Sequence, residues 1–168
     1  GDGRFMMWGS SQAQRYHMRW FEKHLPKDGS VRIEALGMKL IGLSIAGPKA
    51  RELLQRLTDD DMSNEAFRFM DYREMEVATV QAKVNRITYT GDLGYEIWVA
   101  PEYQRRLYQS ILDAGADLGL RNFGMRALLC LRLEKHFGTW FREFRPIYGP
   151  FEAGLDRFIK LDKPDFIG

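Results

Sequence analysis

Glu96 is the acidic residue with the clearest chemical context, because it follows a glycine-rich turn at 91–94. β-rich runs lie on both sides of that turn, at 83–90 and 95–99, which indicates a β-hairpin. A loop that is symmetric about the centre of the turn places Tyr89 directly opposite Glu96. Because side chains alternate between the faces of a strand, the two residues are then expected to share one face.

The same register pairs Ile87 with Trp98, so the predicted face carries a carboxylate beside the rings of Tyr89 and Trp98. Such a surface suits a flat heterocycle with adjacent N–H donors, since rings cover its faces and two carboxylate oxygens accept in parallel. The alternative is a half-buried sheet face on which Glu96 meets water or a lysine. The residue types alone leave both interpretations open.

Arg126 is a second candidate, in the first turns of a predicted apolar helix. A buried arginine is costly unless a carboxylate or carbonyl group meets it. Arg126 is therefore expected either to pair with Glu134 or another acid, or to bind an anionic or carbonyl group of a ligand. The single cysteine, Cys130, lies among leucines in the same segment and is expected to be a buried, unreactive thiol.

No metal site is expected. The histidines His17, His24 and His136 are too widely spaced for a compact ligand motif, and the acidic run 59–61 lacks the alternating pattern of a calcium loop. Phosphate-loop and dinucleotide glycine patterns are also absent, as is the Gly-x-Ser-x-Gly sequence of a nucleophile elbow. The residues therefore indicate a ligand-binding face and assign no catalytic group.

Composition narrows the class of protein. The 168 residues include 25 Lys or Arg and 23 Asp or Glu, with signs alternating along the chain, so a nucleic-acid partner is not expected. No apolar run approaches the roughly 18 residues of a membrane span, so no membrane partner is expected. One cysteine fits a reducing compartment, and the bacterial cytoplasm and the mitochondrial matrix both meet that condition.

The positioning elements are expected to form one domain over residues 1–168, of α+β or mixed α/β class, with a largely antiparallel sheet and packed helices. Periodicity and capping predict helices at 12–25, 48–57, 63–70, 101–115 and 122–136. Strands are predicted at 4–8, at 31–46 with a break near Gly37, and at 73–80, 83–90, 95–99 and 157–161.

Four segments resemble, in order, the aminomethyltransferase folate-binding domain of the glycine cleavage T-protein family. They are LSIAGP at 43–48, RITYTGDLGYE at 86–96, GMRALLCLRLE at 124–134 and YGPFEAGLDRFIKLDKPDFIG at 148–168. The resemblance covers most of the chain and supports the α+β class. It implies a tetrahydrofolate site in which Glu96 accepts hydrogen bonds from the pterin, Tyr89 lies near the pterin, and Arg126 belongs to the same site.

The segments RFMMWGSSQAQRYHMRWFEKHLP and TWFREFRPIYGPFE resemble the branch of this family that is fused to flavin enzymes, the dimethylglycine and sarcosine dehydrogenases or oxidases. That branch implies a partner flavin domain, with FAD, in the same full-length polypeptide. There the N-methyl amine is oxidised and the one-carbon unit is captured as methylene-tetrahydrofolate.

The aspartate that the family needs lies on a strand that has no match before Arg4, so the resemblance assigns no catalytic residue. We therefore expect residues 1–168 to be an excised piece of a longer enzyme, inactive by itself. Two alternatives remain at this point: a non-catalytic folate-binding scaffold module, and a free-standing glycine cleavage aminomethyltransferase with a lipoyl-protein partner.

Overall fold

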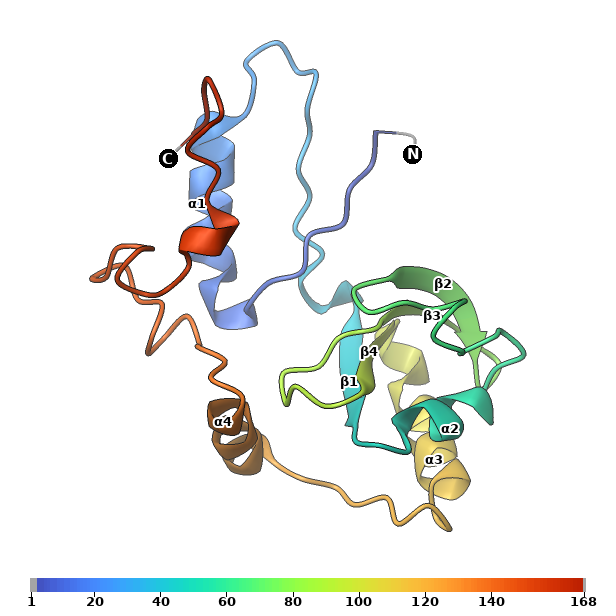
Figure 1. Ribbon diagram of the computed structural model, residues 1–168. Coiled ribbons are helices and arrows are strands. Elements are labelled where there is room, and N and C mark those ends of the chain that lie inside the picture. Colours follow the sequence, from blue (N-terminus) through green and yellow to red (C-terminus); the bar gives the residue numbers. More distant parts are fainter. Residues whose placement is uncertain (1–2, 168) are drawn as a thin grey trace. The chain divides into compact units, whose positions relative to one another are not determined.

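The computed structural model describes residues 3–167, which form two compact units. One unit is Leu36–Phe137, and the other combines the segments before and after it (Figure 1). The expectation of a single domain over the whole chain stays a prediction.

An antiparallel four-stranded sheet forms the centre of the Leu36–Phe137 unit, which confirms the predicted fold class (Figure 1). The spatial order is β1-β4-β3-β2, so β4 and β3 are the inner strands. The strands are β1 (Ile41–Ala46), β2 (Tyr72–Val77), β3 (Val80–Asn85) and β4 (Gly94–Val99). This arrangement leaves β1 and β2 as the edges of the sheet.

One face of the sheet is packed against two helices, α2 (Ala50–Gln55) and α3 (Gln104–Ala114). A short 3-10 turn, η3 (Pro101–Tyr103), precedes α3. The buried residues that meet here are apolar, and their removal from water is the main stabilising contribution to this unit. They include Ile45, Val77, Val84, Tyr95, Ile97 and Val99 from the sheet and Leu53, Leu54, Leu107 and Ile111 from the helices.

The helix α4 (Met125–Glu134) has mostly exposed side chains, and its one buried residue is Arg132. The guanidinium of Arg132 donates to the carbonyl oxygen of Phe137 at 2.7 Å. Leu128, four residues before Arg132, is half-buried on the same side of the helix. Cys130 is half a turn away and exposed, so the expectation of a buried thiol is wrong.

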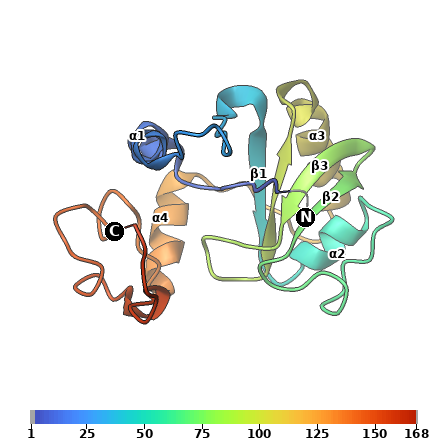
Figure 2. The same cartoon turned by 90° about the horizontal axis from the view of Figure 1, so that it is seen from above.

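The other unit contains the helix α1 (Gln14–His24), preceded by the 3-10 turn η1 (Ser11–Ala13), and a second 3-10 turn, η4 (Asp156–Phe158). Figure 2 shows α1 nearly end-on. Aromatic contacts join α1 to the segment that begins at Gly138: the ring of Trp140 lies 5.3 Å from that of Tyr16 and 6.1 Å from that of His17, between centroids.

Several predicted elements differ from the structure. The strands expected at 4–8, 31–36 and 157–161 are not formed among the described residues, and Gly37–Lys39 is a 3-10 turn, η2. The helix expected at 63–70 is a series of turns, in which Ser63 Oγ accepts from the Ala66 amide at 3.2 Å. A serine side chain that accepts from nearby backbone amides stabilises a turn as well as the start of a helix. The capping signal at Ser63 is therefore met here by a turn that does not continue into a helix. No helix in the described part of the chain has the length and apolar character that a membrane crossing requires.

Gly94, the first residue of β4, has no room for a side chain. A Cβ at this position would clash with the carbonyl oxygen of Ile45 and with Thr88 Cγ2, and would lie 3.0 Å from the Cα of Ala46. Two of these contacts are with the backbone of β1, which cannot rotate away. The close approach of β1 and β4 therefore requires glycine here.

We expect Gly94→Ala to lower the free energy of unfolding by about 2–3 kcal/mol, because the strands must separate to admit the methyl group. Urea unfolding followed by circular dichroism measures this change. The matched control is Gly9→Ala, where the added Cβ meets only His17 Nδ1 at 3.8 Å. Equal stability of the Gly94 variant and the unaltered chain would contradict the packing described here.

Candidate functional site

Glu96 lies on the face of the sheet opposite the helices. Its cross-strand partners are Ser44 on β1 and Asn85 on β3. Trp98 points to the same face because it is two residues further along β4, and its partners are Gly42 and Lys83. The candidate site is thus a carboxylate beside an indole ring, in the middle of the sheet, with the uncharged residues Ser44 and Asn85 directly opposite the carboxylate.

The predicted hairpin register is wrong. Glu96 pairs with Asn85 and Trp98 with Lys83, so Tyr89 is not opposite Glu96 and Ile87 is not opposite Trp98. The β3–β4 connection is an eight-residue loop, 86–93, because the pairing of β3 with β4 ends before Arg86. Its amide donates to Asp71 O at 2.9 Å and its carbonyl oxygen accepts from the Met70 amide at 3.1 Å.

Tyr89 lies in this loop. Its ring stacks on that of Phe137, with centroids 6.5 Å apart and planes 14° apart. The loop is closed by local contacts: the Thr88 hydroxyl donates to Asp92 O at 2.7 Å, and the Gly47 amide donates to Leu93 O at 2.8 Å. Tyr89 is therefore held against the segment after α4, away from the strand position that was expected.

The Glu96 carboxyl is half-buried, and burial raises its pKa above the ordinary value of 4.5. The adjacent Trp98 side chain acts in the opposite direction and lowers the pKa. Lys83 is the cation on the same face of β3, but it forms an ion pair with Glu74 and donates to the Tyr72 hydroxyl at 3.2 Å. Among the described residues, no cation is paired with Glu96.

Arg126 is exposed in the first turn of α4. An ion pair with Glu134 or another acid was one of the two alternatives for Arg126, and none is formed in the described part of the chain. The arginine that α4 buries is Arg132, which the sequence analysis did not single out. Its spacing of four residues from Leu128 was the available signal, since it places both side chains on one side of a helix.

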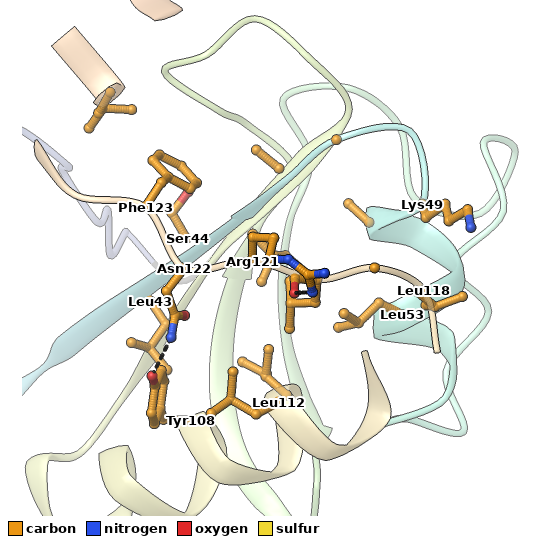
Figure 3. A pocket seen from close by; sticks show the side chains of 18 of the residues that line it. Leu43, Ser44, Lys49, Leu53, Tyr108, Leu112, Leu118, Arg121, Asn122 and Phe123 are labelled. Atoms are coloured by element: carbon orange, nitrogen blue, oxygen red, sulfur yellow. Dashed lines mark hydrogen bonds between the residues drawn. The ribbon is translucent and has the colours of Figure 1, made fainter. Parts of the chain in front are cut away.

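A pocket of about 810 Å³ lies along the free edge of β1, between α3 and the segment 118–125 (Figure 3). Its lining is mostly apolar, with the side chains of Lys49 and Arg121 among the polar groups. The Asn122 amide donates to the Tyr108 hydroxyl at 2.7 Å across one end of it (Figure 3). The pocket includes Ser44, but none of the predicted site residues lines it.

Known proteins match nearly the whole chain. The model of the GCVT N-terminal domain matches residues 1–163. Human mitochondrial dimethylglycine dehydrogenase is 40% identical over 168 residues, which are 99% of this chain and 19% of that protein. Human mitochondrial sarcosine dehydrogenase is 38% identical over 136 residues, which are 80% of this chain and 14% of that protein.

An aminomethyltransferase of Caldanaerobacter subterraneus is 42% identical over 139 residues, which are 82% of this chain and 37% of that protein. Among solved structures, a chain of the heterotetrameric sarcosine oxidase from Corynebacterium sp. U-96 matches with a TM-score of 0.50 and 15% identity. That match covers 58% of this chain and 49% of the oxidase chain, and it supports the fold alone.

The chain spans about a fifth of the length of the dimethylglycine dehydrogenase that it matches. Both the family model and these relatives cover most or nearly all of the chain, and the solved structure is similar in fold over 58% of it. The chain therefore belongs to the GCVT N-terminal domain family, the family to which its hairpin and tail motifs already pointed.

Proposed function

We propose that this chain is the tetrahydrofolate-binding part of a flavin-linked dimethylglycine or sarcosine dehydrogenase or oxidase. The observation that carries the proposal is the half-buried Glu96 carboxylate, which has no cationic partner among the described residues and lies beside an indole ring. The relatives named dimethylglycine and sarcosine dehydrogenase support the class of reaction. Relatives of mitochondrial and of bacterial origin support a matrix or a bacterial cytoplasmic location.

A pterin edge has the chemistry that Glu96 needs. The amino group and the adjacent ring N–H are parallel donors, and a carboxylate accepts from both with its two oxygens. Placing a charged carboxylate in a half-buried position costs free energy, and two charge-assisted hydrogen bonds from a ligand offset that cost. Asn85, the residue opposite Glu96 on β3, is neutral and almost fully buried, so it supplies no competing charge.

Tyr89 and Arg126 complete the proposed site. Tyr89 lies within the loop 86–93, and its ring contact with Phe137 restricts its position before any ligand binds. Arg126 presents an exposed guanidinium at the first turn of α4, available to an anionic or carbonyl group of the folate.

The one-carbon unit comes from a flavin-dependent oxidation in another part of the full-length polypeptide. The flavin supplies the oxidation of the N-methyl amine when it is bound there. In this proposal the residues of the present chain bind and orient the folate that takes up the one-carbon unit, and limit the access of water to it.

We expect the charge on Glu96 to make the unliganded chain less stable as the pH rises. Burial raises the pKa in the folded chain, so between the unfolded value near 4.5 and the folded value the folded chain binds more protons. The free energy of unfolding therefore falls with rising pH through this window. Glu96→Gln removes the effect, and its stability relative to the unaltered chain should be greater at pH 7 than at pH 4.

Urea unfolding at the two pH values measures this difference. The control is Glu76→Gln, which removes an exposed carboxylate from β2 on the same face of the sheet. If the Glu96 and Glu76 variants changed stability with pH in the same way, burial of the Glu96 carboxylate would have no measurable cost. No ligand would then be needed to offset that cost.

We expect Glu96→Ala to weaken tetrahydrofolate binding to the 168-residue chain by about 30-fold to 1000-fold, since two ligand donors would lose their acceptor (about 2–4 kcal/mol). Isothermal titration calorimetry under anaerobic conditions gives the two dissociation constants. Glu76→Ala is the control and should bind as the unaltered chain does. Equal affinity of the Glu96 variant and the unaltered chain would remove Glu96 from the site.

A further inference from the structure

The helix α4 ends in a tight backbone cap that is built on Arg132. The backbone carbonyl oxygen of Arg132 accepts from the Phe137 amide at 2.9 Å. The carbonyl oxygen of Leu133 accepts from the His136 amide at 3.0 Å, which completes the Schellman arrangement. His136 has the left-handed backbone that this arrangement requires, with a φ of 58°, although glycine is the usual residue there. The chain therefore turns sharply at His136 and brings Phe137 back to the last turn of α4.

The side chain of Arg132 adds a bond that this cap does not need. Its guanidinium Nη1 donates to the carbonyl oxygen of Phe137 at 2.7 Å. Both backbone groups of Phe137 are thus bonded to a single residue. Arg132 is only 2% exposed, and burial of a guanidinium is costly. Since the two backbone bonds already close the helix, the effect of the buried side chain is to fix the position of Phe137.

Phe137 in turn supports the loop 86–93 at two points. Its ring stacks on that of Tyr89, with planes 14° apart. At Gly91, which has a φ of 74°, a Cβ would lie 3.0 Å from Phe137 Cε2 and 2.6 Å from Lys135 Cγ. The backbone of the loop therefore lies directly on the side chains of residues 135 and 137, and a side chain at position 91 would lift the loop away from them.

We propose that Arg132 is a positioning residue for folate binding, because it fixes Phe137, and Phe137 holds the loop that carries Tyr89. The proposal rests on the proposed function, in which Tyr89 and Arg126 both belong to the folate site. Arg126 and Arg132 lie on the same helix, so this link connects the helix that bears one site residue to the loop that bears the other. A ligand that contacts both then loses less free energy in ordering them.

A purely local role for Arg132 makes a different prediction. A cation in the last turn of a helix interacts favourably with the helix dipole, and this would stabilise α4 without any effect on the loop. Removal of the guanidinium would then change stability and leave the ring of Tyr89 in place. The position of the Tyr89 ring therefore distinguishes the two roles.

The first measurement is the ring proton shifts of Tyr89 in the 168-residue chain without ligand, by NMR with carbon-13 in the tyrosine rings. Tyr89→Phe identifies the signals by their loss. Arg132→Met removes all side-chain N–H donors but keeps the Phe137 ring, and it should move the Tyr89 signals in the direction in which Phe137→Leu moves them. Arg132→Lys keeps a cationic donor and should move them less far in that direction. Arg105→Gln removes an exposed arginine from α3 and is the matched control, which should leave them unchanged.

The second measurement is a double-mutant cycle of tetrahydrofolate binding, by anaerobic calorimetry. Phe137→Leu should raise the dissociation constant about tenfold in the unaltered chain and less than about twofold in the Tyr89→Ala chain, because it acts through Tyr89. Phe69→Leu changes an exposed phenylalanine of the same unit and should leave the constant unchanged.

Two results would overturn the proposal. One is an equal loss of affinity from Phe137→Leu in both chains. The other is unmoved Tyr89 signals in the Arg132 variants that unfold cooperatively, with Arg132→Lys deciding if Arg132→Met does not fold. Failure of the unaltered chain to bind tetrahydrofolate would instead contradict the proposed function, and the ring proton shifts would still decide whether Arg132 holds the loop.

Discussion

The alternation of side chains along β4 is the constraint on which both the core and the candidate site depend. Tyr95, Ile97 and Val99 face the helices and are buried, so Glu96 and Trp98 must face the other way. A shift of this strand by one residue would place the carboxylate in an apolar core and the isoleucine in the site. The burial of three large side chains therefore fixes the direction of Glu96 more firmly than any contact that Glu96 itself makes.

Much of this arrangement was predictable from local patterns. The β-rich run 95–99 matches β4, and the proline-led segment 101–115 matches η3 and α3, because hydrophobic periodicity and helix-start chemistry act over a few residues. The β2–β3 hairpin was not predictable in the same way. Its turn is Ala78-Thr79, with φ of 52° and 63°, and neither residue is a usual choice for a left-handed backbone. The expected strand 73–80 therefore ran through the turn.

The register of β3 and β4 depends on contacts far apart in sequence. The glycine-rich turn indicated a tight hairpin, but Arg86 bonds to the backbone of residues 70 and 71 rather than to β4, and the loop ends at Leu93 through the Gly47 amide of the β1–α2 connection. No pattern within residues 83–99 contains those partners. Local patterns were also insufficient for α4. Its apolar composition predicted burial of Cys130, but Cys130 is exposed, and the side chains of Leu128 and Arg132 are the ones that are partly or fully buried.

The corrected register changes the reason for selecting Glu96, although the residue is the same. The expected neighbour across the hairpin was Tyr89, and the observed neighbours are Asn85, Ser44 and, along the strand, Trp98. A phenol can donate to the carboxylate and accept from a ligand, whereas the indole only donates and the serine and asparagine are uncharged. This environment leaves the carboxylate without a competing cation, so N–H donors on a ligand are the groups that would compensate its burial.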